Sequence, residues 1–95
     1  MIQVRYEAPC RMTFSGHAGY AAVGQDIVCA GISALWGTLA ADLALRGEGA
    51  CIERGKLSCN RDSEADMERS FQMIWRGILL LAEKYPDFIS AKRAW

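Results

Sequence analysis

The stretch FSGHAGYAAVGQDIVCAGISAL, residues 14–35, decides the fold, because a strand gives way in it to a glycine-rich loop and then to a long helix. Asp26 is suited to cap that helix, since its carboxylate can accept hydrogen bonds from the unpaired N–H groups of the first turn. The apolar residues that recur at helical spacing after it are Val28, Ile32, Leu35, Leu39 and Leu43. We therefore predict a loop over residues 16–25 and a core helix that ends near Arg46.

Two hairpins are predicted from alternating side chains on either side of this helix. Residues 2–7 and 11–15 alternate apolar with polar residues, and a proline favours a turn between them. Residues 50–54 and 56–60 form a second pair of short strands around Gly55. Both pairs are expected to be antiparallel.

A second helix is predicted after Ser63, which is an N-cap residue, and Pro86 ends it because proline cannot continue a helix. Leu79 and Leu80 lie partly off its apolar stripe and are candidates for contact with a partner chain. Residues 92–95 are expected to form a loose end. The stripe itself consists of Met67, Phe71, Ile74, Ile78, Leu81, Ala82 and Tyr85.

The predicted fold class is α+β, with residues 1–95 as a single domain, since 95 residues do not suffice for a second core. We expect a two-layer sandwich in the order β-β-α-β-β-α. Its small, mostly antiparallel, four-stranded sheet carries both helices on one face. A chain this small buries only about 60–65% of the surface that its unfolded form exposes, so dimerisation is expected.

Charge and hydropathy narrow the class of partner. Eleven Lys and Arg residues balance eleven Asp and Glu residues, which leaves no basic field for a phosphate backbone, so nucleic acid is not an expected partner. The most apolar stretch, residues 27–45, contains Asp42 and several small residues, which indicates a buried helix and no membrane span. No signal peptide is recognised, so we expect a cytoplasmic protein.

The four cysteines, Cys10, Cys29, Cys51 and Cys59, do not form a metal-binding pattern, because no CxxC pair is present and there is one histidine. No metal or cofactor is expected. A reducing cytosol argues against disulfides, and in the second hairpin Cys51 and Cys59 would point to opposite faces. We interpret Cys10, Cys51 and Cys59 as structural or incidental.

A catalytic dyad is the sharpest hypothesis from the residues themselves. With Asp26 as the cap, Cys29 is the third residue of the helix, where the positive end of the helix dipole favours a thiolate. His17, on the preceding loop, is close enough in sequence to pair with that thiolate and then protonate a leaving amine. The glycines that allow such a loop to close over a substrate are Gly16, Gly19 and Gly24.

Two further residues have roles that the sequence leaves open. Asp26 either orients the imidazole or only caps the helix. Ser33, one turn after Cys29 on the same helical face, donates to the thiolate, to the substrate or to its own helix carbonyl. The N–H groups around Cys29 are candidates for an oxyanion hole.

The motifs GHAGYA (residues 16–21) and GQDIVCAGISAL (residues 24–35) together resemble the signature of the ribosomal-processing cysteine protease family, Prp (YsxB-like). The resemblance implies a small homodimer that removes a short N-terminal extension from large-subunit ribosomal protein twenty-seven. The cut would follow a short apolar motif that contains an aromatic residue. The substrate partner is thus expected to be the N-terminal peptide of a ribosomal protein.

The resemblance also implies roles for single residues. By matching position, Cys29 is the nucleophile and His17 is the general base and acid. Asp26 and Ser33 are supporting residues. The residues of the loop that orders around the substrate peptide are Gly16, Gly19, Tyr20 and Gly24.

Three alternatives remain open from the sequence. The chain could be a non-enzymatic module that captures a ribosomal or assembly-factor peptide by strand addition. It could be a paralogue that processes phage structural proteins. In a third reading, Cys29 is a redox-sensing thiol.

Overall fold

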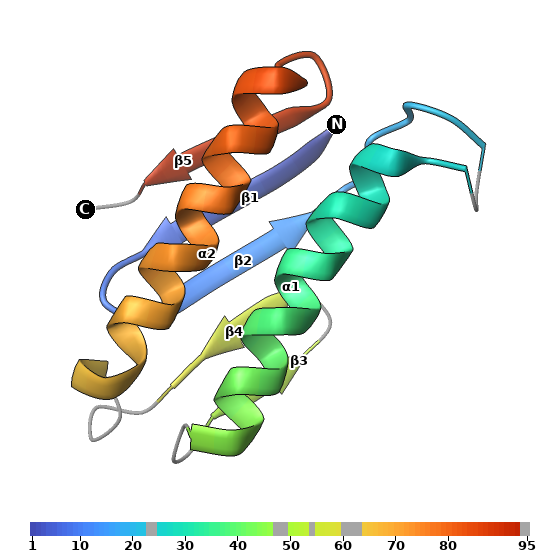
Figure 1. The fold of residues 1–95 in the computed structure, drawn as a ribbon. Helices are drawn as coiled ribbons and strands as arrows, with labels where there is room; N and C mark the ends of the chain where they lie inside the picture. Colours follow the sequence, from blue (N-terminus) through green and yellow to red (C-terminus); the bar gives the residue numbers. More distant parts are fainter. Residues whose placement is uncertain (23–24, 47–49, 54, 60–63, 94–95) are drawn as a thin grey trace.

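The computed structural model of the chain describes residues 1–22, 25–46, 50–53, 55–59 and 64–93. Both helices cover the same face of one sheet (Figure 1), so the predicted two-layer arrangement is confirmed. The elements follow in the order β1 (Ile2–Glu7), β2 (Arg11–Ser15), α1 (Ile27–Arg46), β3 (Cys51–Glu53), β4 (Lys56–Ser58), α2 (Glu64–Lys84) and β5 (Ile89–Arg93).

The sheet has five strands in the order β3-β4-β2-β1-β5, so the predicted four-stranded sheet is wrong by one strand. The two predicted hairpins are present and antiparallel, and β2 pairs antiparallel with β4. β5 runs parallel to β1, with Ile89 opposite Ile2, so the sheet is mixed. The predicted order β-β-α-β-β-α therefore lacks its last strand. Lys92 and Arg93, which were expected in a loose end, belong to β5, whereas residues 94–95 lie outside the described residues.

The core lies between the sheet and the helices. β1 buries Ile2, Val4 and Tyr6 and leaves Gln3 and Arg5 exposed, as its alternation predicts. A shift of one residue in register would expose all three apolar side chains, so burial fixes the pairing of this strand. The helices and neighbouring strands supply the rest of this core, including Met12, Val28, Leu39, Leu43, Leu57, Met67, Phe71 and Ile78.

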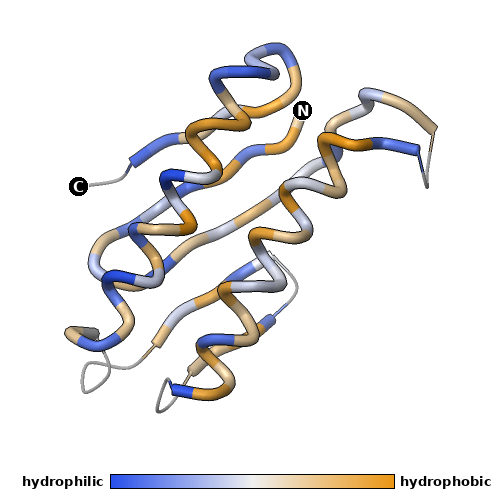
Figure 2. Tube along the Cα trace, viewed as in Figure 1, coloured by the Kyte–Doolittle hydropathy of each residue, from blue (hydrophilic) through white to orange (hydrophobic). Residues whose placement is uncertain are grey.

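The two helices differ in how their apolar residues are distributed. Figure 2 shows apolar and pale colours along most of α1, with hydrophilic colour near its carboxyl end, whereas hydrophilic positions recur along α2. By length and composition alone α1 could cross a membrane, with a mean hydropathy of 1.6. In the structure it packs on α2 and the sheet with Val28, Ile32, Leu39, Ala40 and Leu43 buried, which is the packing predicted for it.

Glycines allow α1 and α2 to approach closely. A Cβ at Gly31 would lie 3.1 Å from Leu81 Cδ1, and a Cβ at Gly77 would lie 3.0 Å from Leu35 Cδ2. Leu81 therefore packs directly onto the backbone of α1 at Gly31, and Leu35 onto the backbone of α2 at Gly77. A residue larger than glycine at either position would crowd the leucine. The predicted cap of α2, Ser63, lies outside the described residues.

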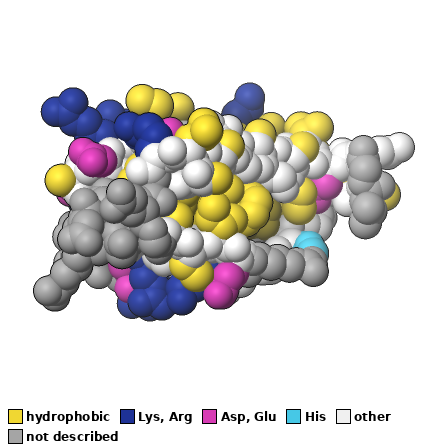
Figure 3. Space-filling view, turned by 90° about the horizontal axis from the view of Figure 1, so that it is seen from below, with side chains coloured by type: hydrophobic (Ala, Val, Ile, Leu, Met, Phe, Trp, Pro, Cys, Tyr) yellow, Lys and Arg dark blue, Asp and Glu magenta, His cyan; other side chains and the backbone are white. Residues whose placement is uncertain are grey.

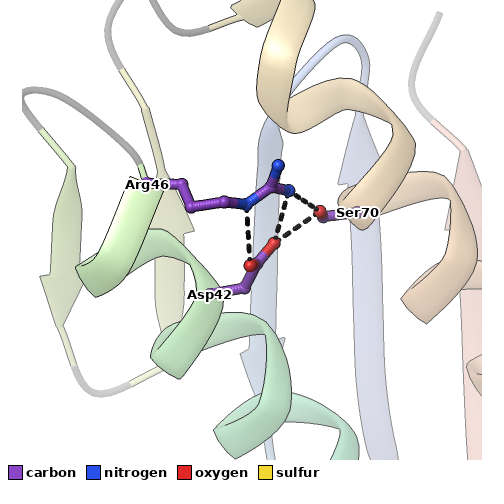
Figure 4. A network of polar contacts seen from close by, with 3 residues as sticks. All are labelled: Asp42, Arg46 and Ser70. Carbon is purple, nitrogen blue, oxygen red and sulfur yellow. Dashed lines mark hydrogen bonds and ion pairs between the residues drawn. The ribbon is translucent and has the colours of Figure 1, made fainter.

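A polar network fastens the two helices near the carboxyl end of α1 (Figure 4). Arg46 Nε donates to Asp42 Oδ1 at 2.9 Å, and the Ser70 hydroxyl donates to Asp42 Oδ2 at 2.5 Å. Arg46 also donates to the Ser70 oxygen at 2.7 Å. The hydrogen bonds from Arg46 and then Ser70 hold the pKa of Asp42 below its ordinary value, against partial desolvation.

A disulfide joins Cys10 and Cys59, which the sequence analysis did not expect. Because β2 pairs with β4, the residue before β2 lies beside the residue after β4, and the Cys59 N–H donates to the Cys10 carbonyl at 3.3 Å. The expectation of no disulfide is therefore wrong for this pair. Cys51 and Cys59 are not joined, as predicted, and the free cysteines are Cys29 and Cys51.

Candidate active site

The site lies where β2 ends and the chain passes to α1. Gly16 has φ 83°, and a Cβ there would overlap the Met1 carbonyl oxygen, so both its backbone and its surroundings require glycine. Gly19 has φ 69° with open space around it, so only its backbone conformation favours glycine. Gly24, the third glycine predicted for this loop, lies outside the described residues.

Asp26 caps α1, as predicted. Its Oδ1 accepts from the Cys29 N–H at 2.9 Å, and its Oδ2 accepts from the Tyr20 N–H at 3.1 Å. The Cys29 N–H is the main cause of its lowered pKa. The N–H groups of Tyr20 and Ala21 and the Cys29 thiol add to that lowering, while partial desolvation opposes it. Both carboxylate oxygens are thus occupied by backbone, and among the described residues none joins Asp26 to His17 by a hydrogen bond.

The thiol of Cys29 lies under the loop. The Ala18 N–H donates to Cys29 Sγ at 3.4 Å, and Ala18 is itself buried, with 5% of its surface exposed. Cys29 is the third residue of α1 and is half-buried. The sulfur therefore sits between the loop backbone and the capped first turn of the helix.

A cavity of about 290 Å³ brings together four of the predicted residues, Gly16, His17, Cys29 and Ser33. Ser15 lines it beside them, and the predicted residues Gly19, Tyr20 and Asp26 do not. Its remaining lining is mainly apolar and consists of Ile2, Phe14, Ile32, Trp36 and Gly55. The cavity thus combines a thiol, an imidazole and two hydroxyls with an apolar wall.

Trp36 is the lining residue that the sequence analysis missed. It lies three residues after Ser33 and seven after Cys29, so it shares their face of α1. That spacing was visible in the sequence, but a tryptophan on a core helix is more simply interpreted as a packing residue, and Trp36 does pack partly against the core. Gly55 reaches the cavity because its carbonyl accepts from the Phe14 N–H at 2.7 Å, which ties the β3–β4 turn to the end of β2.

The imidazole is at the surface. His17 is exposed, and in the described part of the chain its ring makes no hydrogen bond or ion pair. In Figure 3 the only histidine lies at one end of a face on which hydrophobic side chains gather in the middle. The predicted pairing of His17 with Cys29 is therefore seen as a shared cavity and not as a hydrogen bond.

Tyr20 was predicted to belong to the substrate loop, and its side chain packs against the turn between α2 and β5. Its ring meets Tyr85 at a centroid distance of 5.7 Å and Phe88 at 5.3 Å, both edge to face.

Among the described residues no group of three or more His, Cys, Asp or Glu side chains could hold a metal ion.

Comparison with known proteins gives one family. The profile described as cysteine protease Prp matches residues 1–90. No curated protein matches the chain.

Several solved structures share the fold. A ribosomal processing protease Prp from S. aureus with a covalently linked product peptide has a TM-score of 0.87 at 22% identity, covering 99% of this chain and 100% of that chain. The same protease with a substrate peptide has a TM-score of 0.81 at 20% identity, with 99% and 100% covered. SMU.848 from Streptococcus mutans has a TM-score of 0.74 at 27% identity, with 98% and 93% covered.

Proposed function

This protein belongs to the cysteine protease Prp family, and on that premise we propose that it removes a short N-terminal extension from a ribosomal protein, namely large-subunit ribosomal protein twenty-seven. The observation that carries the proposal is the shared cavity of His17, Cys29 and Ser33 beside an apolar wall. The S. aureus structures that share the fold hold a substrate peptide and a product peptide, which supports a peptide as the ligand here.

In the proposed reaction Cys29 Sγ attacks the carbonyl carbon of the scissile bond. His17 takes the thiol proton and passes it to the leaving amine as the C–N bond breaks, which leaves a thioester on Cys29. A water molecule, deprotonated by His17, then attacks the thioester, and the acid product leaves as the thiol is restored. The exposed imidazole supports this role because it has room to serve both partners in turn.

The oxyanion needs a donor other than the Cys29 N–H, because that group is already bound to Asp26 Oδ1. The Ala18 N–H, 3.4 Å from Sγ, is a donor beside the reacting atom and turns from the sulfur to the oxyanion as Sγ bonds to the carbonyl carbon, before the C–N bond breaks. Ser33 then remains a supporting donor to the substrate from the next turn of α1. Asp26 acts as the cap that holds Cys29 in place.

The apolar wall selects the peptide. Phe14, Ile32 and Trp36 offer an apolar surface beside the thiol and suit an apolar or aromatic side chain next to the cut. This agrees with the apolar, aromatic-containing motif that the family resemblance implies. A polar residue at that substrate position would lose its hydration without gaining a partner.

A cleavage assay tests residue, reaction and target together. A peptide that spans the extension and the mature N-terminus is incubated with the protein, and the products are identified by mass spectrometry. The parent and Cys51→Ala should give one cut, and Cys29→Ala should give none, since Cys29 is the only one of the two free cysteines that lines the cavity. Equal cleavage by Cys29→Ala would overturn the mechanism.

We also propose that the protein is a cytoplasmic homodimer. The exposed apolar residues Leu79 and Leu80, with Met73, support a contact through α2. Sedimentation of Leu80→Lys against the parent tests it, and an unchanged dimer would exclude this surface. In a cytosol, where thiols are kept reduced, Cys10 and Cys59 would be neighbouring thiols.

A further inference from the structure

The loop that carries His17 is held by aromatic side chains from a distant part of the chain. Tyr20 packs edge to face against Tyr85 and Phe88, with interplanar angles of 74° and 81°. Edge-to-face contacts at such distances are among the favourable geometries for aromatic pairs. Tyr85 and Phe88 follow α2 and lie outside the lining of the cavity.

The turn that presents these two rings is tied down by its own backbone. The N–H groups of Phe88 and Ile89 both donate to the Tyr85 carbonyl, at 3.0 and 3.2 Å. The Phe88 carbonyl in turn accepts from the Ile2 N–H at 2.8 Å, and Ile2 lines the cavity. The two rings are therefore fixed relative to the site and form a firm support for Tyr20.

The contact sits beside the polar contacts that shape the site. Tyr20 donates its own N–H to Asp26, and two residues earlier the Ala18 N–H reaches Cys29 Sγ. Tyr20 still exposes 44% of its surface, so burial alone does not hold it in place. Without the two rings, segment 16–22 would keep its backbone hydrogen bonds to Asp26 and Sγ and the buried Ala18 side chain but lose the aromatic contacts of Tyr20.

We propose that Tyr85 and Phe88 are positioning residues that act through the Tyr20 ring to hold segment 16–22 over Cys29. The part of this inference that concerns catalysis rests on the proposed function, whereas the ordering of the segment does not. The rings touch neither the thiol nor the imidazole. They restrict where the Ala18 N–H and His17 can lie, and thus how often both face the sulfur.

The test uses four single variants of the full chain and one double variant, Tyr20→Ala/Phe88→Leu. Phe88→Leu keeps apolar volume at the turn but removes the ring, Tyr20→Ala removes its partner, and Tyr20→Phe keeps the ring without the hydroxyl. Phe71→Leu is the control for a general loss of stability, because it removes a fully buried ring and its contact with Tyr6 at a centroid distance of 6.1 Å, away from the segment. Hydrogen exchange of residues 16–22 and kcat/KM for the peptide are measured in each.

Phe88→Leu should speed exchange in residues 16–22 by about 3- to 10-fold relative to Phe71→Leu, which is the range for losing one aromatic pair. Tyr20→Ala should speed it at least as much, because it loses the pairs with both Tyr85 and Phe88. Tyr20→Phe should match the parent. The fall in kcat/KM should be of similar size and should not multiply in the Tyr20→Ala/Phe88→Leu double variant, because both changes remove the same contact.

Either of two results would overturn the proposal. One is exchange in Phe88→Leu that equals that of Phe71→Leu, and the other is a double variant whose losses multiply. Exchange is read without any substrate, so it distinguishes a failed positioning role from a failed protease assignment. If no variant, parent included, cuts the peptide, the exchange data still decide whether the rings hold the segment.

Discussion

The two ends of α1 each carry an aspartate with a lowered pKa, but they use it differently. At the amino end Asp26 is bound by backbone N–H groups, and the nearby side chains of His17 and Cys29 are left facing a cavity. At the carboxyl end Asp42 is bound by the side chains of Arg46 and Ser70, which are all consumed in holding α1 to α2. Polar side chains at the amino end of α1 are thus open to a ligand, whereas those at its carboxyl end stabilise the fold. Substitutions should accordingly separate activity from stability.

The largest effect is expected at the amino end. His17→Gln removes the proposed proton carrier but keeps a polar side chain on an exposed position, so kcat should fall by about 10²–10⁴-fold. The free energy of unfolding should change by less than about 0.5 kcal/mol, as for most surface substitutions. Single-turnover cleavage and urea unfolding measure the two. If His17→Gln unfolded more easily than the parent and cut the peptide at the same rate, the proposed difference between the two ends of α1 would be wrong.

The next effect concerns the disulfide, which lies outside the cavity. The variant Cys10→Ser/Cys59→Ser should have a free energy of unfolding about 2–4 kcal/mol lower than that of the disulfide-bonded parent, because the unfolded chain of the variant is not cross-linked. Its kcat/KM should stay within about twofold of the parent, since neither residue lines the cavity. Denaturant unfolding without reductant gives the first value. Parent protein with reductant added should match the variant, and a drop in kcat/KM equal to that of His17→Gln would contradict this separation.

The local half of this arrangement could be predicted from the sequence. A cap, its N–H partner and the helix face that follows are set within a few residues, so Asp26, Cys29 and Ser33 were placed correctly. Alternation likewise located both hairpins. These features depend on spacing along the chain, which the sequence states directly.

The parts that were missed depend on which distant segments meet. β5 buries only Ile89 fully, so its five residues carry little alternation, and its pairing comes from where α2 returns the chain to β1. The bond between Cys10 and Cys59 needs the pairing of β2 with β4, which neither hairpin predicts. For the same reason Phe88 could not be linked to Tyr20, although both are plain in the sequence.

A smaller effect on stability is expected from two glycines of the loop. Gly16→Ala should cost at least about 2 kcal/mol, because the strain of a positive φ is joined by overlap with the Met1 carbonyl. Gly19→Ala has open space around it and should cost about 1 kcal/mol, from φ alone. Thermal unfolding of the two variants side by side measures the difference. Equal costs would mean that segment 16–22 moves away from β1 to admit the methyl group.

The smallest effects are expected at the network on the carboxyl end of α1. Ser70→Ala should lower the free energy of unfolding by about 1 kcal/mol, since one hydroxyl bridge between the helices is lost. Its kcat/KM should equal that of the parent. Ser33→Ala is the matched control, because the same change at the amino end should lower kcat/KM and leave stability nearly unchanged.

The same network should be visible in the pH dependence of stability. The pKa of Asp42 is lowered from its ordinary value of 3.8 in the folded chain, so its contribution is full above that value. As the pH falls below 3.8 through the folded pKa, the contribution is lost. Asp42→Asn should therefore be less stable than the parent by no more than about 1 kcal/mol at pH 7, because the ion pair is partly exposed, and the gap should close in acid. Urea midpoints measured from pH 7 down to about pH 3 test this, with Asp87→Asn as the exposed control. A gap that stays constant across this range would mean that the carboxylate charge contributes nothing to holding α1 and α2 together.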